Sequence, residues 1–488
     1  MMSNGIIKNA GDMKLLYAEI LSVVGRMQVA RGALMLVSVS LGILVTRLLG
    51  PEEFGKLTFV WTLVSTLGAV GSLGLSEVLV RFIPSLEDAD QRIKLYHTAL
   101  AAVLVAWIIS LVCYYAVTRF GGLAMSELSG IEGPFLAGIG VTALLTINLG
   151  MLRGLGRFMA LPVLDLIKDT LPRALIAGMI ALFAITGYQA AFAVNLWLLC
   201  GAFAVSCALL GATWHQVQPV RLVFSRLQLW YAFLTFFGSL LMLGTLNVHN
   251  ILLTLFMSVE EVGYLTAGMA IPRMLLAVIV VSMAAPLVYY FSGPIPDAHK
   301  NKIIEIGTKI IEFLIGVITL IIMALAEWLI PTLLGPGYSA SVPVLQAFIG
   351  IVFILCNQTF LGPHFYGIHR PLVPMLFGTG GFILMFALDL VMIPRFGPVG
   401  AALAEVLAAT VQSVVYVLVM QHVYRIDIQR ASLTLLALWA GAGALELTAG
   451  MFSGVAVFVA GAIGLGVVRP GDIENLRTVF LQRGSVIG

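Results

Sequence analysis

The sequence predicts an all-α integral membrane protein with about 14 transmembrane helices, arranged as two pseudo-symmetric six-helix lobes and two C-terminal helices. The 488-residue chain is 60% hydrophobic and only 10% charged, whereas soluble domains carry about 25% charged residues. Its apolar residues form long runs, each with roughly the 20 residues that a helix needs to cross the hydrocarbon core. A short motif also recurs between such runs, which indicates two related halves.

Cationic residues mark one side of the membrane. All but five of the 27 Lys and Arg lie in alternate gaps between apolar runs or in the tails. The exceptions are Arg47, Lys56, Arg119 and Arg395 on the other side, and Arg273 inside a span. Because cationic loops stay cytoplasmic during insertion, we expect a multi-pass protein of the cell inner membrane with both termini in the cytoplasm. The expected spans are residues 28–48, 58–83, 97–118, 134–151, 162–186, 190–213, 229–256, 262–290, 309–330, 341–365, 371–392, 398–420, 432–449 and 451–468.

An internal repeat supports the two-lobe organisation. The sequence GPEEFGKLT at residues 50–58 returns as SVEEVGYLT at residues 258–266, 208 residues later. The paired acids suit the positive N-terminus of the next helix, and the Gly permits a tight turn. Transporters are commonly built from internal repeats with the site at their interface. We therefore divide the chain into an N-terminal lobe, an inter-lobe cytoplasmic linker, a C-terminal lobe and two additional helices with a cytoplasmic tail, at residues 1–213, 214–228, 229–420 and 421–488.

Charged residues inside spans are costly in hydrocarbon and therefore mark candidate functional sites. Arg273 lies about three helical turns into its span, directly after Pro272. Its guanidinium keeps its charge and matches phosphate geometry with parallel donors. It is therefore either a substrate-binding cation or one half of a structural ion pair. Arg31 and Arg47, near the two ends of the first span, either face a cavity or snorkel to the membrane interface.

Several acids lie deep enough to carry a coupling ion. Glu77 and Arg81, four residues apart in the second span, can pair on one helix face; alternatively, Arg81 faces a cavity and Glu77 carries a proton. Asp389, Glu405 and Glu446 are the deep acids of the second half. Desolvation favours the protonated form of such a group. We treat Glu77, Asp389 and Glu405 as candidate ion-coupling residues, with capping or pairing as the alternative.

Other polar residues have simpler expected roles. His249 and Asn250 interrupt the seventh apolar run, where we expect hydrogen bonds between helices rather than ligand binding. Asp165, Lys168 and Asp169 lie at the start of the fifth span, where we expect them to be solvated at its cytoplasmic end.

The sequence shows no enzyme or cofactor motif. It lacks P-loop, HExxH and GxSxG patterns, and its seven His are scattered. The external gaps are too short for a catalytic domain, which disfavours a membrane-embedded glycan polymerase or ligase, and the buried arginines disfavour a structural scaffold. A net charge of +3 gives no reason to expect a nucleic-acid partner. We predict a transporter without a cofactor or metal.

Four segments carry a family resemblance, in this order: RLLGPEEFGKLTFVWTLVSTLGAVGSLGLSEVLVRFIP (47–84), LRGLGRFMALPVLDLIKDTLPRAL (152–175), LLGPGYSASVPVL (333–345) and IPRFGPVGAALAEV (393–406). Together they resemble polysaccharide-export flippases of the multidrug/oligosaccharidyl-lipid/polysaccharide (MOP) superfamily. The resemblance implies two six-helix lobes around a central cavity. It also implies transport of a polyprenyl-diphosphate-linked oligosaccharide from the cytoplasmic to the outer leaflet, for O-antigen, capsule or exopolysaccharide synthesis. By position, Arg31, Arg47, Arg81 and Arg273 would be the basic residues that bind the diphosphate.

The resemblance also implies partners and leaves alternatives open. Expected partners are the lipid-linked oligosaccharide, membrane lipids, and polysaccharide polymerase and chain-length machinery. We expect alternating access, with the lobes rocking about the 214–228 linker, and either a proton or a sodium ion as coupling ion. Related flippases often have an acid in the seventh span, where this chain has His249 and Asn250. The alternatives are a MATE-type multidrug or cation antiporter, disfavoured because residues 28–48 contain no Asp or Glu, and a lipid-linked peptidoglycan-precursor flippase.

Overall fold

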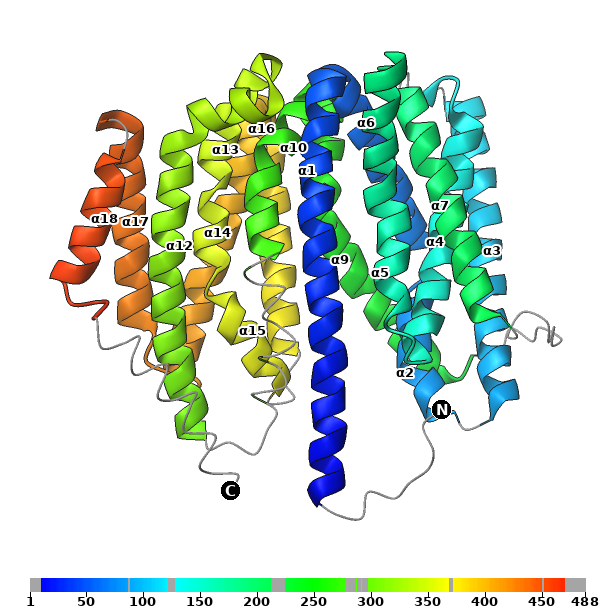
Figure 1. Ribbon diagram of the computed structural model, residues 1–488, viewed down its shortest axis with the longest axis horizontal. Helices are drawn as coiled ribbons and strands as arrows, with labels where there is room; N and C mark the ends of the chain where they lie inside the picture. Colours follow the sequence, from blue (N-terminus) through cyan, green and yellow to red (C-terminus); the bar gives the residue numbers. More distant parts are fainter. Residues whose placement is uncertain are drawn as a thin grey trace. The chain divides into compact units, whose positions relative to one another are not determined.

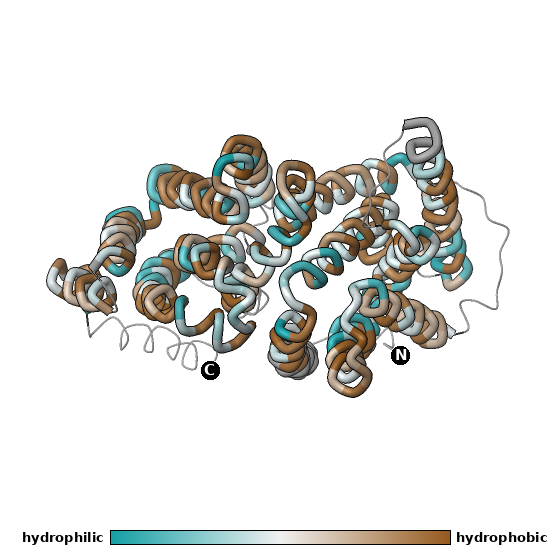
Figure 2. The backbone as a smooth tube through the Cα atoms, turned by 90° about the horizontal axis from the view of Figure 1, so that it is seen from above, coloured by the Kyte–Doolittle hydropathy of each residue, from teal (hydrophilic) through white to brown (hydrophobic). Residues whose placement is uncertain are grey.

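The computed structural model of the protein describes residues 10–86, 88–121, 128–211, 224–277, 279, 287, 291, 297–367, 372–449 and 452–469. Over these residues the chain is helical, and no strand occurs among them. Eight described helices are long and apolar enough to cross a membrane, or nine if the bent pair Arg226–Leu241 and Leu243–Phe256 is one span. Hydrophobic residues run along most of these helices (Figure 2). The predicted all-α membrane class is confirmed, and the count of about 14 spans stays a prediction.

The helices form two compact units. The first contains Met1–Val45, Leu67–Ile185 and Ala190–Phe236, and the second contains Thr46–Thr66, Thr186–Gln189 and Phe237–Gly488. Within each unit the long helices run roughly parallel to one another (Figure 1). The predicted lobe boundaries stay a prediction, and residues 214–223 of the predicted linker lie outside the described residues.

The elements of the first half of the chain are α1 (Ala10–Gly71), α2 (Leu75–Phe82), η1 (Ile83–Ser85), α3 (Ala89–Gly121), α4 (Glu132–Gly154), α5 (Ala160–Asp165), the π-helix η3 (Leu166–Thr170), α6 (Leu171–Phe183) and α7 (Tyr188–Leu210). Those of the second half are α9 (Arg226–Phe256), α10 (Val259–Leu276), α12 (Asp297–Leu334), η5 (Pro336–Ser341), α13 (Val342–Phe348), α14 (Gly350–Leu355), α15 (Gln358–Gly367), α16 (Leu372–His422), α17 (Gln429–Ala449) and α18 (Ser453–Gly464).

The predicted second span is broken between α1 and α2. Leu73 and Gly74 in the turn have positive φ angles of 53° and 69°, a conformation that favours glycine. Gly74 also lies against α9, because a Cβ at this position would be 2.4 Å from the Ala232 carbonyl oxygen. The break therefore lets two backbones of the first unit approach closely.

A buried hydrogen-bond network joins α3, α4 and α7 in the first unit. The Tyr96 hydroxyl donates to Asn148 Oδ1 at 2.8 Å, and Asn148 Nδ2 donates to Ser206 Oγ at 2.8 Å. All three side chains are fully buried. In a low-dielectric interior such bonds are strong when every group is satisfied, so the network fixes the rotation of α4 between its neighbours.

The two copies of the repeated motif contact each other in the second unit. A Cβ at Gly55 would lie 2.2 Å from the Val259 carbonyl oxygen, and a Cβ at Gly263 would lie 2.2 Å from the Pro51 carbonyl oxygen. Val259 and Gly263 follow Pro51 and Gly55 by 208 residues each, so the two contacts are equivalent under the repeat. The two helix backbones cross about a local two-fold axis, at a separation that only glycine permits.

α1 and α16 each contain two helices joined at a glycine. Gly50 has a φ of 77° and Gly397 a φ of 58°, which residues with a Cβ rarely adopt. Each glycine is followed by Pro51 or Pro398, and proline is well suited to the first turn of a helix. The links expected at 49–57 and 393–397 are therefore sharp kinks rather than loops.

Glu446 connects the two last helices. Its carboxylate accepts hydrogen bonds from the backbone N–H groups of Phe452 and Gly454, the latter at 2.7 Å. These groups lie at the start of α18, where N–H groups have no partner within the helix. Of the alternatives considered for this acid, capping is the one that the structure shows.

Replacing Gly55 or Gly263 with Ala is expected to destabilise the protein by about 1–3 kcal/mol, because the added methyl group would overlap a backbone carbonyl. The measurement is the thermal unfolding midpoint of the purified protein in detergent. Gly380→Ala is the matched control, since nothing lies within 4 Å of a Cβ at this helical glycine. Equal midpoints for all variants and the wild type would contradict the close crossing.

Candidate functional site

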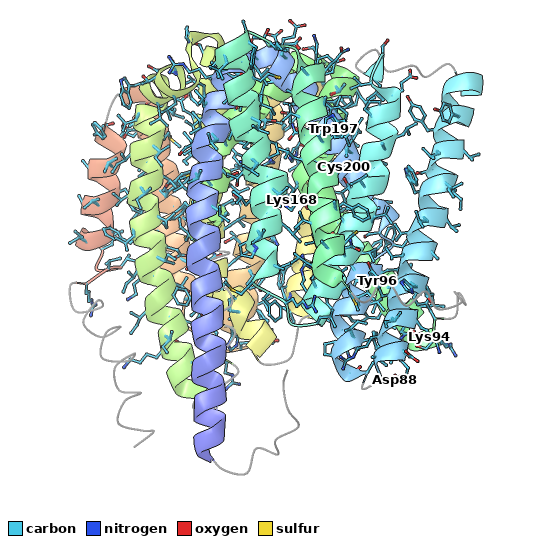
Figure 3. All side chains as sticks on the ribbon, turned by 45° about the vertical axis from the view of Figure 1, so that its right-hand side comes forward. Asp88, Lys94, Tyr96, Lys168, Trp197 and Cys200 are labelled. Atoms are coloured by element: carbon cyan, nitrogen blue, oxygen red, sulfur yellow. The ribbon has the colours of Figure 1, made fainter. Side chains whose placement is uncertain are left out.

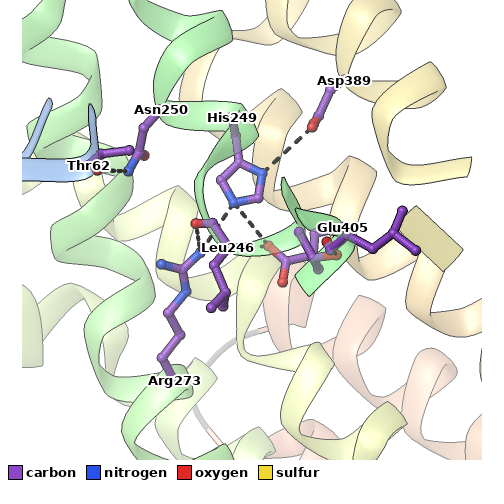
Figure 4. A network of polar contacts seen from close by, with 9 residues as sticks. Thr62, Leu246, His249, Asn250, Arg273, Asp389 and Glu405 are labelled. Carbon is purple, nitrogen blue, oxygen red and sulfur yellow. Dashed lines mark hydrogen bonds and ion pairs between the residues drawn. The ribbon is translucent and has the colours of Figure 1, made fainter. Parts of the chain in front are cut away.

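Four ionisable side chains from three helices meet in the second unit (Figure 4). His249 lies on α9, Arg273 on α10, and Asp389 and Glu405 on the two halves of α16. The structure thus brings together three of the residues that the sequence analysis singles out as candidates, Arg273, Asp389 and Glu405. We call these four side chains the His249 cluster.

The kink in α16 places both acids at the same depth. Asp389 precedes Gly397 by eight residues and Glu405 follows it by eight, so each lies about 12 Å from the kink along its own helix. The two halves of α16 are antiparallel, as the rings of Phe377 and Tyr416 near their far ends are 4.4 Å apart. Equal distance from the kink therefore brings the acids side by side.

The Arg273 side chain lies at the same level as the two acids, although its Cα is further from the start of its own helix than theirs are from the α16 kink. It lies 14 residues into α10, counted from Val259, which corresponds to about 21 Å. Side chains on a helix point back toward its N-terminus, and the long arginine side chain can cover part of that distance. Its Nη2 lies 3.2 Å from His249 Nε2 and 3.4 Å from the Leu246 carbonyl oxygen.

His249 lies between the two acids. Its Nδ1 is 3.6 Å from Asp389 Oδ2, and its Nε2 is 3.5 Å from Glu405 Oε2. Both distances exceed those of a hydrogen bond, about 2.7–3.2 Å. Within the described residues, His249 Nδ1, both Asp389 carboxylate oxygens and Glu405 Oε2 make no hydrogen bond although they are buried. Buried polar atoms are nearly always satisfied, so such a group of unsatisfied atoms is typical of a functional site.

Arg273 is only partly neutralised by its neighbours. Its Nη2 lies 3.9 Å from Glu405 Oε2, and 32% of its side chain is exposed. A guanidinium has five N–H donors in a planar fork, whereas the polar contacts described above all involve Nη2. The remaining donors can bind an anion with two acceptor oxygens, such as a phosphate group.

Two amides hold α9 in place beside the second half of α1. Asn250 Nδ2 donates to Thr62 Oγ1 at 3.2 Å, and Asn247 Nδ2 donates to Thr66 Oγ1 at 3.0 Å. The hydrogen bond between helices expected for Asn250 is therefore present. His249 also makes contacts between helices, but with charged partners. The polar interruption of an apolar run was the signal in the sequence, and the partners could not be identified from it.

Arg31 and Arg47, the predicted cations near the first span, have no described contact with the His249 cluster. Arg47 Nη1 donates to the Thr332 carbonyl oxygen at 3.2 Å, close to the C-terminal end of α12, where a cation is favourable. Nearby, the Tyr338 hydroxyl donates to the Thr46 carbonyl oxygen at 2.8 Å. Arg31 lies outside the residues whose side chains the structure describes.

Arg81 and Glu77 lie in the first unit and do not form the pair that their spacing suggests. The Arg81 guanidinium lies 5.0 Å from the centre of the Tyr231 ring, within the range of a cation–π contact. Glu77 Oε1 lies 3.4 Å from Arg153 Nη1 on α4. Helix packing thus offers Glu77 a cation from another helix in place of the one on its own.

The first unit contains a charged group on one helix, formed by Asp165, Lys168 and Asp169. Lys168 lies midway along this unit, whereas Asp88 and Lys94 lie at its end (Figure 3). Its Nζ contacts Asp165 Oδ1 at 3.3 Å and also Asp169, and 24% of its side chain is exposed. Helical turns precede and follow these residues, and the expectation of a solvated helix end stays a prediction.

A π-helix, η3, presents this charged group. It covers Leu166–Thr170, and π-helical turns frequently occur at functional sites. One turn further along, Arg173 Nη1 donates to the Ser38 carbonyl oxygen on α1 at 2.8 Å. Several charges within a single apolar run were the signal available in the sequence.

Comparison with solved structures identifies the fold. The lipid II flippase MurJ in an inward closed conformation matches with a TM-score of 0.69 and 12% identity, over 94% of this chain and 99% of its own. An inward-facing multidrug resistance MATE transporter of the MOP superfamily matches with a TM-score of 0.62 and 16% identity, over 81% and 95%. A MOP superfamily transporter from Pyrococcus furiosus, described as having a binding pocket of reverse polarity, matches with a TM-score of 0.56 and 15% identity, over 83% and 97%. The fold is that of MOP transporters.

Comparison of sequences identifies the family. No curated protein sequence matches this chain. The sequence model of a family described as polysaccharide biosynthesis protein matches residues 44–343. This range includes both copies of the repeated motif, the π-helix and Arg273. Since the match covers more than half of the chain, the protein belongs to the polysaccharide biosynthesis protein family.

Proposed function

We propose that the protein is a flippase that moves a polyprenyl-diphosphate-linked oligosaccharide from the cytoplasmic to the outer leaflet by alternating access. The product would serve O-antigen, capsule or exopolysaccharide synthesis. Family membership supports the substrate class, and a fold shared with a lipid II flippase supports the type of reaction.

The observation that carries the proposal is the partly exposed guanidinium of Arg273 within an apolar helix of the second unit. A charge at this depth is expensive and is kept where it has a use. Two phosphate groups present several acceptor oxygens, which suit the free donors of the fork. Arg31, Arg47 and Arg81 stay candidates for contacts with the diphosphate or sugar in other conformations.

The energetics explain why such a substrate needs a protein. Phosphate charges and sugar hydroxyls lose their hydration in hydrocarbon at high cost. Polar side chains replace that hydration, while the polyprenyl chain can stay in the lipid. An inside-negative membrane potential contributes about 2.3 kcal/mol per charge per 100 mV to the outward movement of an anion. The potential therefore favours export.

The His249 cluster is our candidate for ion coupling. Asp389 and Glu405 lie on either side of the His249 imidazole, and within the described residues their carboxylates have oxygens without a hydrogen-bond partner. A proton bound there would give some of these atoms a partner. We therefore take a proton, rather than a sodium ion, as the coupling ion at this cluster. Glu77, the third acid considered, has Arg153 as its partner instead.

The cellular setting belongs to the same proposal. Cationic gaps support an inner-membrane protein with both termini in the cytoplasm. In this scheme the two lobes rock about the 214–228 linker, and polysaccharide polymerase and chain-length machinery use the exported lipid.

A MATE-type cation antiporter is the second candidate, because the His249 cluster combines two acids with only one permanent cation. A cationic drug would be attracted to such acids, whereas a diphosphate would be attracted to Arg273. A peptidoglycan-precursor flippase, the other alternative, would use the same diphosphate chemistry with a different glycan. Transport assays with the three substrates distinguish these functions.

Arg273→Ala is expected to reduce translocation of a lipid-diphosphate oligosaccharide in proteoliposomes about 10–100-fold. The reason is the loss of charge-assisted hydrogen bonds, which contribute about 1.5–3 kcal/mol, at about 1.4 kcal/mol per tenfold in rate. Arg273→Lys keeps the charge without the fork and should give an intermediate rate. The measurement is the rate at which labelled head groups become accessible on the opposite leaflet.

Arg395→Ala is the matched control, because this exposed arginine of α16 lies outside the His249 cluster. It should translocate at the wild-type rate. A folded Arg273→Ala protein with unchanged translocation would remove Arg273 from the site. Exchange of cationic drugs without lipid translocation would identify an antiporter.

Asp389→Asn is expected to abolish the response of translocation to an imposed pH gradient, because the amide keeps the size of the carboxyl group but cannot take up a proton in its place. Residual translocation should be slower by at least about tenfold. Glu327→Gln, a change at an exposed acid of α12, is the control and should respond to the gradient like the wild type. An unchanged gradient response in Asp389→Asn would exclude this residue from coupling.

A further inference from the structure

A further buried carboxyl group, that of Glu312, lies in the second unit outside the His249 cluster. Glu312 on α12 is only 4% exposed. Its Oε2 accepts a hydrogen bond from Ser432 Oγ on α17 at 2.8 Å. Within the described residues, no ion pair joins Glu312 to a cation. Ser432 and the Asn357 side chain are its hydrogen-bonding neighbours, and two neutral groups do not offset the cost of burying a carboxylate.

Asn357 provides an unsatisfied oxygen beside this acid. The residue lies between α14 and α15 and is only 2% exposed. Its Nδ2 donates to Ser413 Oγ on α16 at 2.7 Å. Its Oδ1 has no hydrogen-bond partner in the described part of the protein. A buried amide oxygen without a partner is rare and calls for a ligand.

A small cavity lies between these side chains. Its volume is about 10 Å³, and its polar lining residues are Glu312, Asn357, Ser413 and Ser432. The remaining lining side chains are apolar and come from the same helices. A volume of this size holds about one water molecule and therefore also a single dehydrated monovalent cation.

We propose that this cavity is a binding site for one sodium ion, held by the Glu312 carboxylate, Asn357 Oδ1 and the hydroxyl oxygens of Ser413 and Ser432. The available donors are all oxygen atoms, which hard cations prefer. One carboxylate and one monovalent cation give a neutral site. Sodium would supply the counter-charge that an ionised Glu312 needs, which a water molecule cannot supply.

The ion would fasten α17 to α12. One further contact already joins α17 to α12, and another joins α17 to α14. Trp439 Nε1 donates to Thr319 Oγ1 at 2.9 Å. Trp439 follows Ser432 by seven residues, and Thr319 follows Glu312 by seven residues. The Trp439 ring also stacks on Phe353, with ring centres 5.1 Å apart. The sodium site thus completes an interface whose function is structural, and it does not rest on the proposed transport activity.

The test is the thermal unfolding midpoint of the full-length protein in detergent, in NaCl and in choline chloride of equal concentration. Sodium should raise the wild-type midpoint by about 2–4 °C, because a ligand that binds only the folded state stabilises it. Glu312→Gln should lose this rise, and binding of radioactive ²²Na⁺ should fall by one ion per protein. Glu327→Gln, a change at an exposed acid of the same helix, should keep both.

Ser432→Ala is a second variant that tests the site even if the Glu312→Gln protein does not fold. Loss of one hydroxyl ligand should raise the sodium concentration of half-maximal stabilisation about tenfold. The proposal is overturned if sodium does not stabilise the wild type, if Glu312→Gln responds like the wild type, or if Glu327→Gln also loses the response. Stabilisation by acid alone would assign the neutralising charge to a proton and would also overturn it.

Discussion

The backbone contact between Gly55 and Gly263 determines how the second unit is assembled. Each glycine lies against a backbone carbonyl oxygen of the opposite helix. A Cβ atom at either glycine would be 2.2 Å from that oxygen. The crossing sets α10 against the second half of α1. Seven residues beyond Gly55, Thr62 holds Asn250 of α9, and ten residues beyond Gly263 lies Arg273. One close contact thus helps to orient α9 and α10, which supply His249 and Arg273, two of the four residues of the His249 cluster.

A second constraint governs the charges inside the helices, because hydrocarbon offers them no hydration. The structure meets it in different ways. Glu446 satisfies the N–H groups at a helix start, Arg173 binds a carbonyl group of α1, and Lys168 lies between two acids. Within the described residues, none of these three side chains has a buried polar atom without a partner. The His249 cluster and the Glu312 cavity are incomplete, since unsatisfied atoms remain in both, and incomplete sites are where a ligand gains the most.

The two incomplete sites differ in a way that fits different roles. The His249 cluster contains a partly exposed arginine and two acids, so a ligand or proton can enter and leave it. Glu312 lies among apolar side chains of α14, α16 and α17, where an ion would be held rather than exchanged. A transporter needs both kinds of site, because a mobile binding site works only on helices whose mutual packing is firm.

Composition and the placement of apolar runs were enough to establish an all-helical membrane protein, its repeated motif and the depth of Arg273, Asp389 and Glu405, since these follow from local hydropathy and chain position. The partners of the charged residues were decided only by tertiary structure. Glu77 contacts Arg153 rather than Arg81, and His249 rather than a carboxylate of the seventh span joins the two acids. Such pairs lie far apart in the chain, and the rotation of each helix about its axis, which brings them together, depends on packing contacts that periodicity does not encode.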